Sequence, residues 1–342
     1  MVASTLLHEL RLAVGEAHVH TDLSGHPALT DYRGVYQGQA LALVQPANTD
    51  EVAAVVRACH RHRQPIVVQG GNTGLLGAAT PTADGRAVLL QLHRLNRVRE
   101  LDLGNDTITV EAGCILQDVQ ARAAESQRLF PLALGAQGSC TIGGNLGTNA
   151  GGIQVLRYGN MRELTLGLEV VTAEGEVWHG LRGLRKDNTG YDLRDLFIGS
   201  EGTLGIITAA TLKLFPKPLR FHTAVLKVAT PRDAVALLGQ LKQRWGASLT
   251  AFELLPGSVL AFVRERLPEQ ALPVDDLDPT AAYILTDYSD FTGDDWQHKL
   301  FEQPLTEALE AGLLLDALVA HNDTQRQRWW QFREHSIMAA QA

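Results

Sequence analysis

A strand followed directly by a glycine turn is the first segment of this sequence that could do chemistry. The apolar run 66–68 leads through Gln69 into residues 70–74, which read Gly-Gly-Asn-Thr-Gly. Consecutive backbone N–H groups in such a turn form a concave nest that suits a phosphate or pyrophosphate. The chain has neither the Gly-Lys pair of a P-loop nor the spacing of GxGxxG. The turn therefore indicates neither a Walker ATPase nor a standard dinucleotide site, and an ordinary tight turn is the alternative.

Two further segments combine glycine with uncharged polar side chains. Residues 135–145 read Gly-Ala-Gln-Gly-Ser-Cys-Thr-Ile-Gly-Gly-Asn, and residues 148–152 read Thr-Asn-Ala-Gly-Gly. Such a wall can hydrogen-bond a polar heterocycle and lets a flat ring pack against backbone. Sixteen of the 32 glycines lie between Gly135 and Gly205. That concentration predicts that backbone, rather than side chains, comes close to a ligand there.

Two histidine pairs are the candidate metal ligands. His18 and His20, and likewise His60 and His62, are two residues apart and would share one face of a strand. Neither pair has a third ligand nearby, and the chain has no HExxH motif and no Cys/His cluster. The second pair falls at the end of a predicted helix, where cationic side chains favour the helix dipole. We therefore predict no metal site.

Alternating strands and helices must position these segments, and their order predicts two domains. Pro216 and Pro218 mark the boundary, which gives domains of 1–218, with a core of about 40–218, and 219–342. In the first domain we expect strands at 40–44, 65–68, 88–92, 107–112 and 205–214, a hairpin at 169–178, and helices at 6–14, 49–60 and 115–124. In the second we expect strands at 224–226, 249–255 and 283–285, and helices at 233–245 and 296–311.

Composition excludes several classes of protein. The chain has 342 residues, 45% of them hydrophobic and 20% charged, and a net charge of -8. No Lys/Arg run follows a nucleic-acid backbone, so we expect no nucleic-acid partner. The cysteines Cys59, Cys114 and Cys140 are scattered, which favours a reducing compartment. Because neither a signal peptide nor a membrane span is indicated, we expect a cytoplasmic protein.

The glycine segments resemble one known family when they are taken together with two longer phrases. Residues 186–193 read Lys-Asp-Asn-Thr-Gly-Tyr-Asp-Leu, and residues 199–206 read Gly-Ser-Glu-Gly-Thr-Leu-Gly-Ile. The four segments, in this order, resemble the flavin domain of the vanillyl-alcohol-oxidase superfamily, in its D-lactate, glycolate and D-2-hydroxyglutarate dehydrogenase branch. Over about 40–218 the resemblance implies an α+β fold: a PCMH-type FAD-binding domain of two α/β subdomains. A partial α+β substrate (cap) domain would follow, and the fold is not a Rossmann fold.

The same resemblance implies where FAD binds. The turn at 69–74 would hold the pyrophosphate, segments 135–144 and 148–152 would flank the flavin, and 201–207 would line the adenine or ribitol side. The residues assigned to the cofactor in this way are Gln69, Gly70, Gly71, Asn72, Thr73, Gly74, Gly135, Gly138, Ser139, Cys140, Thr141, Gly143, Gly144, Thr148, Asn149, Ala150, Gly151, Glu201, Gly202, Gly205, Ile206 and Ile207.

The flavin is expected to be dissociable. Some members of the superfamily attach it through a His in the first glycine turn or a Cys in the second segment. This chain has no His between residues 63 and 92, and Ser139 stands where the linking Cys would be. We interpret the neighbouring Cys140 as a small packed hydrophobe.

Arg333 is the candidate for substrate binding. The run Trp329–Glu334 resembles the family's Trp-x-x-Arg-Glu segment, whose Arg binds the substrate carboxylate. The planar fork of a guanidinium suits a carboxylate because it makes two parallel hydrogen bonds. The alternative is a surface arginine paired with Glu334 or with solvent.

The resemblance implies FAD-dependent oxidation of a D-2-hydroxy acid to the 2-oxo acid by hydride transfer to flavin N5. In the family, a later segment supplies a divalent metal (zinc or similar) site and the base, and no such run occurs before Ala342. We therefore expect an incomplete enzyme without the metal site that binds FAD and turns over poorly.

Several alternatives stay open at this stage. They are a FAD-binding protein without catalysis, a sugar-lactone oxidase with another cap, and an NAD-dependent Rossmann dehydrogenase. The electron acceptor is open, and so is a homodimer formed through an exposed apolar face.

Overall fold

The computed structural model describes residues 2–267 and 274–339. It divides into two compact units. Unit 1 comprises Met1–Gly152 and Gly159–Pro216, and unit 2 comprises Ile153–Tyr158 and Lys217–Ala342. Helices and strands are mixed in both units, so the expected α+β class is confirmed.

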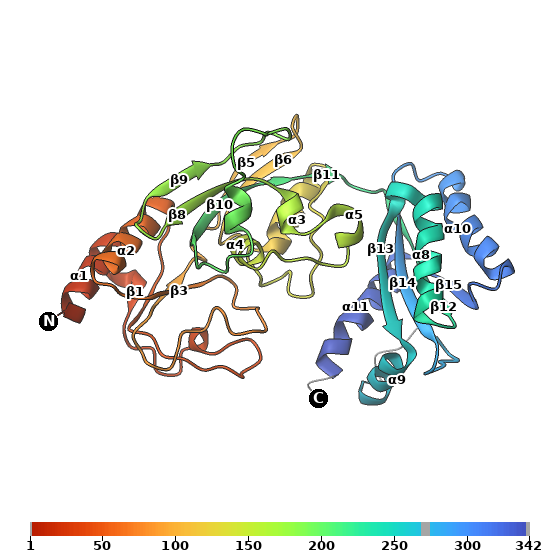
Figure 1. Cartoon of the computed structure of the whole chain (residues 1–342), viewed down its shortest axis with the longest axis horizontal. Coiled ribbons are helices and arrows are strands. Elements are labelled where there is room, and N and C mark those ends of the chain that lie inside the picture. The colour runs from red at the N-terminus through yellow and green to blue at the C-terminus, as the bar shows by residue number, and fades with distance from the viewer. Residues whose placement is uncertain (1, 268–273, 340–342) are drawn as a thin grey trace. The chain divides into compact units, whose positions relative to one another are not determined.

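The first sheet of unit 1 carries the strand that enters the glycine turn (Figure 1). Its order is β1 (Val19–His20), β2 (Ala42–Val44), β4 (Val88–Gln91) and β3 (Ile66–Gln69). β2 and β3 run parallel to β4. Helices α1 (Val2–Val14) and α2 (Thr49–Arg61) place apolar side chains in one core with this sheet. α2 begins where expected, because the Asn48 side chain accepts the N–H of Glu51 at 2.9 Å.

The second sheet of unit 1 is antiparallel throughout. Its order is β5 (Val98–Asp102), β6 (Thr107–Glu111), β10 (Gly205–Lys213), β8 (Thr165–Thr172) and β9 (Val177–Gly180). A short pair, β7 (Arg128–Leu129) with β11 (Phe215–Pro216), and helices α3 (Leu116–Glu125), α4 (Ile142–Gly147), α6 (Met161–Leu164) and α7 (Arg194–Phe197) complete the unit. The sequence did not predict β5, because this edge strand is largely exposed and has no apolar face.

One face of the second sheet holds a buried ion-pair network. Arg99 donates to Glu111 at 3.2 Å and to Glu169 at 3.1 Å, and both carboxylates are buried. Glu169 also accepts from the hydroxyls of Thr49 at 2.6 Å and Thr208 at 2.9 Å. Burial alone would raise the pKa of Glu169, but the hydrogen bonds from Arg99 and the two threonines outweigh it and lower the pKa. The network ties β5, β6, β8, β10 and α2 together.

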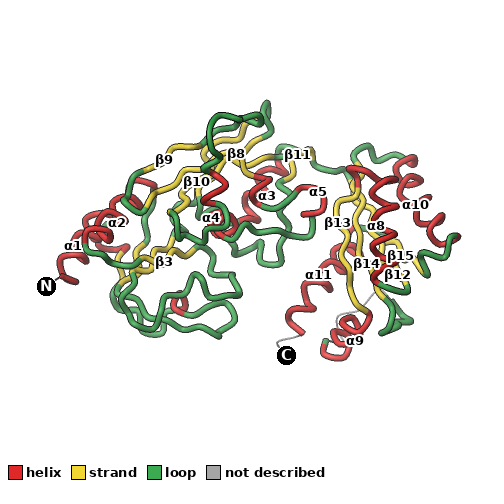
Figure 2. Tube along the Cα trace, viewed as in Figure 1, coloured by secondary structure: helices red, strands yellow, loops and turns green. Residues whose placement is uncertain are grey.

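Unit 2 is a sheet with helices on both faces (Figure 2). The strand order is β13 (Leu249–Pro256), β14 (Ala282–Asp290), β12 (Arg220–Val228) and β15 (Asp316–Val319). One face packs against α8 (Pro231–Trp245) and α10 (Asp295–Glu310). The other packs against α9 (Gly257–Arg266) and α11 (Asp323–Ala339). The sequence analysis did not anticipate α9 or β15.

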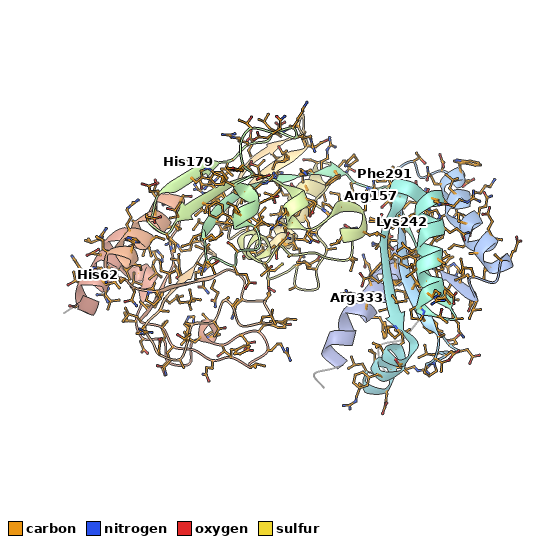
Figure 3. All side chains as sticks on the ribbon, viewed as in Figure 1. His62, Arg157, His179, Lys242, Phe291 and Arg333 are labelled. Atoms are coloured by element: carbon orange, nitrogen blue, oxygen red, sulfur yellow. The ribbon has the colours of Figure 1, made fainter. Side chains whose placement is uncertain are left out.

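A short helix from the glycine-rich part of the sequence belongs to unit 2. This is α5 (Val155–Tyr158). The side chain of Ile153, just before it, packs against the core that the sheet forms with α9 and α11. The guanidinium carbon of Arg157 lies 5.1 Å from the centre of the Phe291 ring, and both residues are labelled in Figure 3. Nothing in the local sequence marks residues 153–158 as part of the second unit, because this contact joins residues that are far apart in the sequence.

We predict that Glu169→Gln destabilises unit 1 by about 2 kcal/mol, since it removes a charge that accepts several hydrogen bonds. Because the folded-state pKa is lowered, the charged Glu169 stabilises the fold above its ordinary value of 4.5 and this stabilisation is lost as the pH falls below it. Urea unfolding at pH 7 and at pH 4 measures both effects. The free energy of unfolding should fall less from pH 7 to pH 4 in the variant than in the unaltered chain.

The matched control is Glu100→Gln, which alters an exposed carboxylate on the same sheet. If both variants unfold alike at each pH, the network does not have the proposed role in stability.

Candidate cofactor site

The first glycine turn lies against the backbone of the second segment. A Cβ atom on Gly71 would come 2.0 Å from the carbonyl oxygen of Ser139, and one on Gly70 would come 2.3 Å from Oγ1 of Thr141. Neither glycine has a positive φ. Glycine is therefore required here for the close approach of two backbones and not for an unusual conformation.

The turn presents free donors. Among the described residues, the backbone N–H groups of 71–76 donate to no other backbone group. Asn72 has φ of 52°, in the left-handed region that few non-glycine residues adopt. Consecutive N–H groups around such a bend form an anion-binding nest. This geometry fits the pyrophosphate of a dinucleotide such as FAD.

Two amide side chains hold this turn in place by hydrogen bonds to backbone carbonyl oxygens. Gln69 is buried, and its Nε2 donates to the carbonyl oxygens of Ala28 at 2.9 Å and Ala79 at 3.0 Å. Asn72 Nδ2 donates to the carbonyl oxygen of Thr30 at 2.8 Å. The side chains of both predicted cofactor residues are thus engaged with the protein. Sequence reasoning missed residues 28–30, at and after the 3-10 turn Pro27–Leu29, because carbonyl oxygens leave no signal in residue type.

In the second segment, the adjacent residues Ser139 and Cys140 differ in exposure. Cys140 is buried, Asn145 Nδ2 lies 3.6 Å from its sulfur, and burial raises the pKa of the thiol. Ser139 is exposed. Thr141 caps α4, since its hydroxyl accepts the N–H of Gly144 at 3.3 Å.

The segment around Glu201 joins the same place. The N–H of Glu201 donates to the carbonyl oxygen of Gly147 at 2.9 Å, and that of Gly199 donates to Leu146 at 2.9 Å. A Cβ on Gly202 would lie 3.5 Å from Val68, on the strand that enters the first turn. Residues 70–76, 139–151 and 199–202 therefore form one surface, which we call the glycine site.

Backbone strain marks each part of the glycine site. Asn72, Asn149 and Glu201 have φ of 52°, 48° and 50°, respectively. Such conformations cost about 1–3 kcal/mol each and concentrate at ligand sites. Asn149 is held by its own side chain, whose Oδ1 accepts the N–H of Arg162 at 3.0 Å.

The other predicted cofactor residues differ in exposure. Those with exposed backbone or side chain are Gly74, Gly135, Gly138, Gly144, Thr148, Gly151 and Gly202. Thr73, Gly143 and Ala150 are half-buried. Gly205, Ile206 and Ile207 begin β10 and are buried. Ile206 belongs to the core of unit 1.

Two further motifs from the sequence make the following contacts. The hydrogen bonds and ion pairs of residues 186–193 stay within 182–196 of the described chain, and Tyr191 is 93% exposed. Arg333 lies in unit 2, where Nε and Nη2 donate to Oε2 of Glu253 at 3.1 and 3.0 Å. The sequence analysis considered Glu334 or solvent as its partner and did not consider Glu253.

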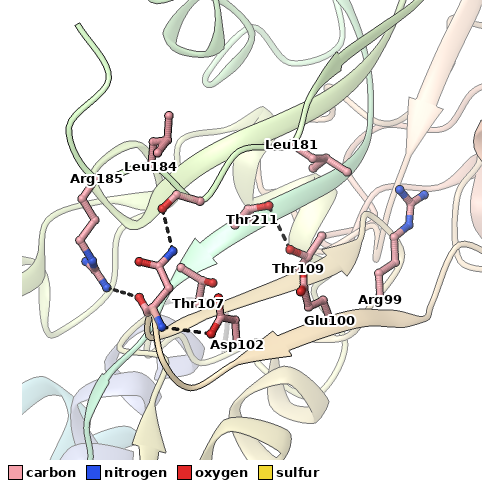
Figure 4. Close-up of a pocket in the computed structure, with 11 residues that line it drawn as sticks. Arg99, Glu100, Asp102, Thr107, Thr109, Leu181, Leu184, Arg185 and Thr211 are labelled. Atoms are coloured by element: carbon pink, nitrogen blue, oxygen red, sulfur yellow. Dashed lines mark hydrogen bonds between the residues drawn. The ribbon is translucent and has the colours of Figure 1, made fainter.

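A separate pocket of about 880 Å³ lies on the polar face of the second sheet (Figure 4). Thr109 and Thr211 share a hydrogen bond of 3.0 Å on its floor, and Asn105 donates to the carbonyl oxygen of Gly183 at 2.8 Å. Arg185 in turn donates to the carbonyl oxygen of Asn105 at 2.8 Å. None of the predicted cofactor residues lines this pocket. These polar groups of the pocket therefore bond one another.

Metal and membrane features were searched within residues 2–267 and 274–339. There, no group of three or more His, Cys, Asp or Glu side chains is arranged to hold a metal ion. Over the same ranges, no helix has the length and apolarity to cross a membrane.

Two family models match the chain. A model described as FAD binding domain matches residues 40–180, and a model described as FAD linked oxidases, C-terminal domain, matches residues 217–342.

Curated relatives are similar over most of the chain. The mitochondrial D-2-hydroxyglutarate dehydrogenase of Arabidopsis thaliana is 38% identical over 96% of this chain and 58% of its own length. The mitochondrial enzyme of Bos taurus is 36% identical over 90% and 55%, respectively. The D-2-hydroxyglutarate–pyruvate transhydrogenase of Saccharomyces cerevisiae is 32% identical over 89% and 60%. The chain therefore spans little more than half the length of these relatives.

Solved structures share the fold at low identity. An alkyldihydroxyacetonephosphate synthase has a TM-score of 0.76 at 18% identity and covers 98% of this chain and 64% of its own. A p-cresol methylhydroxylase with substrate bound has a TM-score of 0.75 at 19% identity, over 96% and 68%. These likenesses confirm the expected fold, which is not the Rossmann fold.

One expectation from the sequence is wrong. A cytoplasmic location was inferred from the scattered cysteines and the N-terminal composition, whereas the D-2-hydroxyglutarate dehydrogenases of Arabidopsis thaliana and Bos taurus are named mitochondrial. Cysteine usage reports the redox state of a compartment and does not identify the compartment.

We predict that Gly71→Ala weakens FAD binding at least tenfold, because the new methyl group would overlap Ser139 and force the turn away. Overpacking of this kind costs about 1–3 kcal/mol. Titration of the purified chain with FAD, followed by flavin fluorescence, measures the affinity.

The control is Gly239→Ala, at a helix position with open space around it, which should leave FAD affinity unchanged. Equal FAD affinity of the two variants would contradict the role of the contact between Gly71 and Ser139.

Proposed function

This chain belongs to the family of FAD-linked oxidases, and on that premise we propose that it binds FAD non-covalently and oxidises a D-2-hydroxy acid to the 2-oxo acid. The observation that carries the proposal is the glycine site. It combines free N–H donors at 71–76 with a closely packed, uncharged second segment. Both parts lie within or beside the residues that match the FAD binding domain.

The glycine site suggests an order for the parts of FAD. The N–H groups of 71–76 would bind the pyrophosphate as a nest. Segments 135–144 and 148–152 would flank the flavin, where glycine lets a flat ring approach the backbone. Residues 201–207 would line the adenine or ribitol side through their backbone, since the side chains of Ile206 and Ile207 are buried.

Non-covalent attachment is supported by the side chains near the glycine site. Cys140 is buried and its raised pKa disfavours the nucleophilic thiolate. The outward neighbour is Ser139, which is a much weaker nucleophile at its free pKa. The first turn contains no histidine.

The substrate class is supported by the relatives and by Arg333. D-2-Hydroxyglutarate dehydrogenases are 36–38% identical to this chain, which supports D-2-hydroxyglutarate as the substrate to test first; D-lactate and glycolate are smaller members of the class. Arg333 would bind the substrate carboxylate with its guanidinium. When bound, FAD supplies the hydride acceptor at N5. The electron acceptor that completes turnover is not assigned.

The test is an anaerobic titration of the FAD-loaded chain. D-2-Hydroxyglutarate should bleach the flavin absorption band, and L-2-hydroxyglutarate should bleach it far less. Failure to bind FAD would contradict the whole proposal. If FAD binds but no D-2-hydroxy acid bleaches it, the proposed oxidation would be contradicted, whereas the assignment of the cofactor site would stand.

We predict that all of the flavin is released when the loaded chain is denatured, because no covalent link holds it. Ultrafiltration after guanidinium denaturation, with absorption at the flavin band, separates free flavin from the polypeptide. Before denaturation, the folded Cys140→Ala variant should bind FAD as well as the unaltered chain does. Flavin that stays with the denatured chain, and is lost with Cys140→Ala, would identify Cys140 as a covalent attachment site.

A further inference from the structure

Glu253 is a charged residue in an apolar row. Residues 251, 253 and 255 alternate on β13 toward the same face of the sheet. Ala251 and Leu255 belong to or pack against the core formed with α9 and α11. Leu285, which is paired with Glu253 across the strands, belongs to the same core. An apolar side chain is the pattern's expectation here, so the carboxylate needs another explanation.

Among the described residues, the partner of this carboxylate is Arg333. Both Nε and Nη2 of the guanidinium donate to Oε2, at 3.1 and 3.0 Å. The two side chains are 30% and 28% exposed. Ion pairs at this exposure contribute little to stability. Fold stability therefore does not explain the placement of Glu253.

A second ion pair shows what a structural anchor of α11 looks like. Asp287 of β14 is fully buried and accepts from Arg326 at 2.6 Å and from Nε1 of Trp330 at 3.0 Å. This pair lies two helical turns before Arg333, on the same side of the helix. Because Asp287 already attaches α11 to the sheet, the contact with Glu253 mainly fixes the end of the Arg333 side chain, which Figure 3 labels on α11.

We propose that Glu253 is a positioning residue that sets the orientation of the Arg333 guanidinium for a substrate carboxylate. Two hydrogen bonds to one oxygen stop rotation about the last bonds of the side chain. Holding a flexible cation in its binding orientation removes an entropic cost of ligand binding. The inference rests on the proposed function, in which Arg333 binds the carboxylate of a 2-hydroxy or 2-oxo acid.

The test measures binding of 2-oxoglutarate, a 2-oxo acid that binds without being oxidised, to the FAD-loaded full chain by titration calorimetry. Glu253→Gln should raise the Kd about tenfold, and Glu253→Asp should recover part of the loss. Glu265→Gln is the matched control, since it alters an exposed carboxylate on α9, and it should leave the Kd unchanged. Dimethyl 2-oxoglutarate, which lacks the carboxylates, should bind the unaltered chain and Glu253→Gln alike.

A double-mutant cycle with Arg333→Ala separates the two proposals. If Glu253 acts through Arg333, then Glu253→Gln has no further effect in the Arg333→Ala chain. Two outcomes would overturn the positioning role alone. One is a further loss of affinity when Glu253→Gln is added to the Arg333→Ala chain. The other is wild-type affinity of the single variant Glu253→Gln when the single variant Arg333→Ala binds weakly. Wild-type affinity of Arg333→Ala would overturn the assignment of Arg333 itself. If Glu253→Gln does not fold, the comparison of Glu253→Asp with Glu265→Gln supplies the same readout.

Discussion

The approach of two backbones at Gly71 and Ser139 is the constraint on which the glycine site depends. The strand β3 leads into the first turn, and the second segment continues into α4, so the two backbones meet where residue 71 cannot carry a side chain. The contact leaves the N–H groups of 71–76 without backbone partners among the described residues. Residues 71–73 are half-buried, and a half-buried donor without a partner is unfavourable. A bound anion would satisfy these donors, which links the packing of unit 1 to its chemistry.

Polar networks fix helices and strands within each unit. Arg99 joins Glu111 and Glu169 across the second sheet, and the amide of Gln69 holds the loop that contains Ala28. In unit 2, Asp287 attaches α11 to its sheet. Each network places a charged or amide group in a position with several partners, as buried polar groups require. The contact between Glu253 and Arg333 differs, because it is partly exposed and adds little to the anchoring.

Much of the fold follows from local sequence. Apolar periodicity and caps predicted α2, α8 and most strands, because these elements bury one face and alternate accordingly. β5 and the helix 155–158 were not predicted, since the first is an exposed edge and the second is held by contacts distant in sequence. Within the glycine site, the residue types at 70–74 and 139–152 were visible beforehand. The carbonyl oxygens that brace Gln69 and Asn72 were not.

The sequence by itself determined the family, the α+β class and the glycine-rich segments, because these depend on residue type and order along the chain. Only the tertiary structure decided that residues 70–76, 139–151 and 199–202 form one surface. It also decided that Glu253 is the partner of Arg333. The physical reason is that a hydrogen bond or a backbone contact is set by distance in space. Residue order fixes which groups exist, and packing fixes which of them meet.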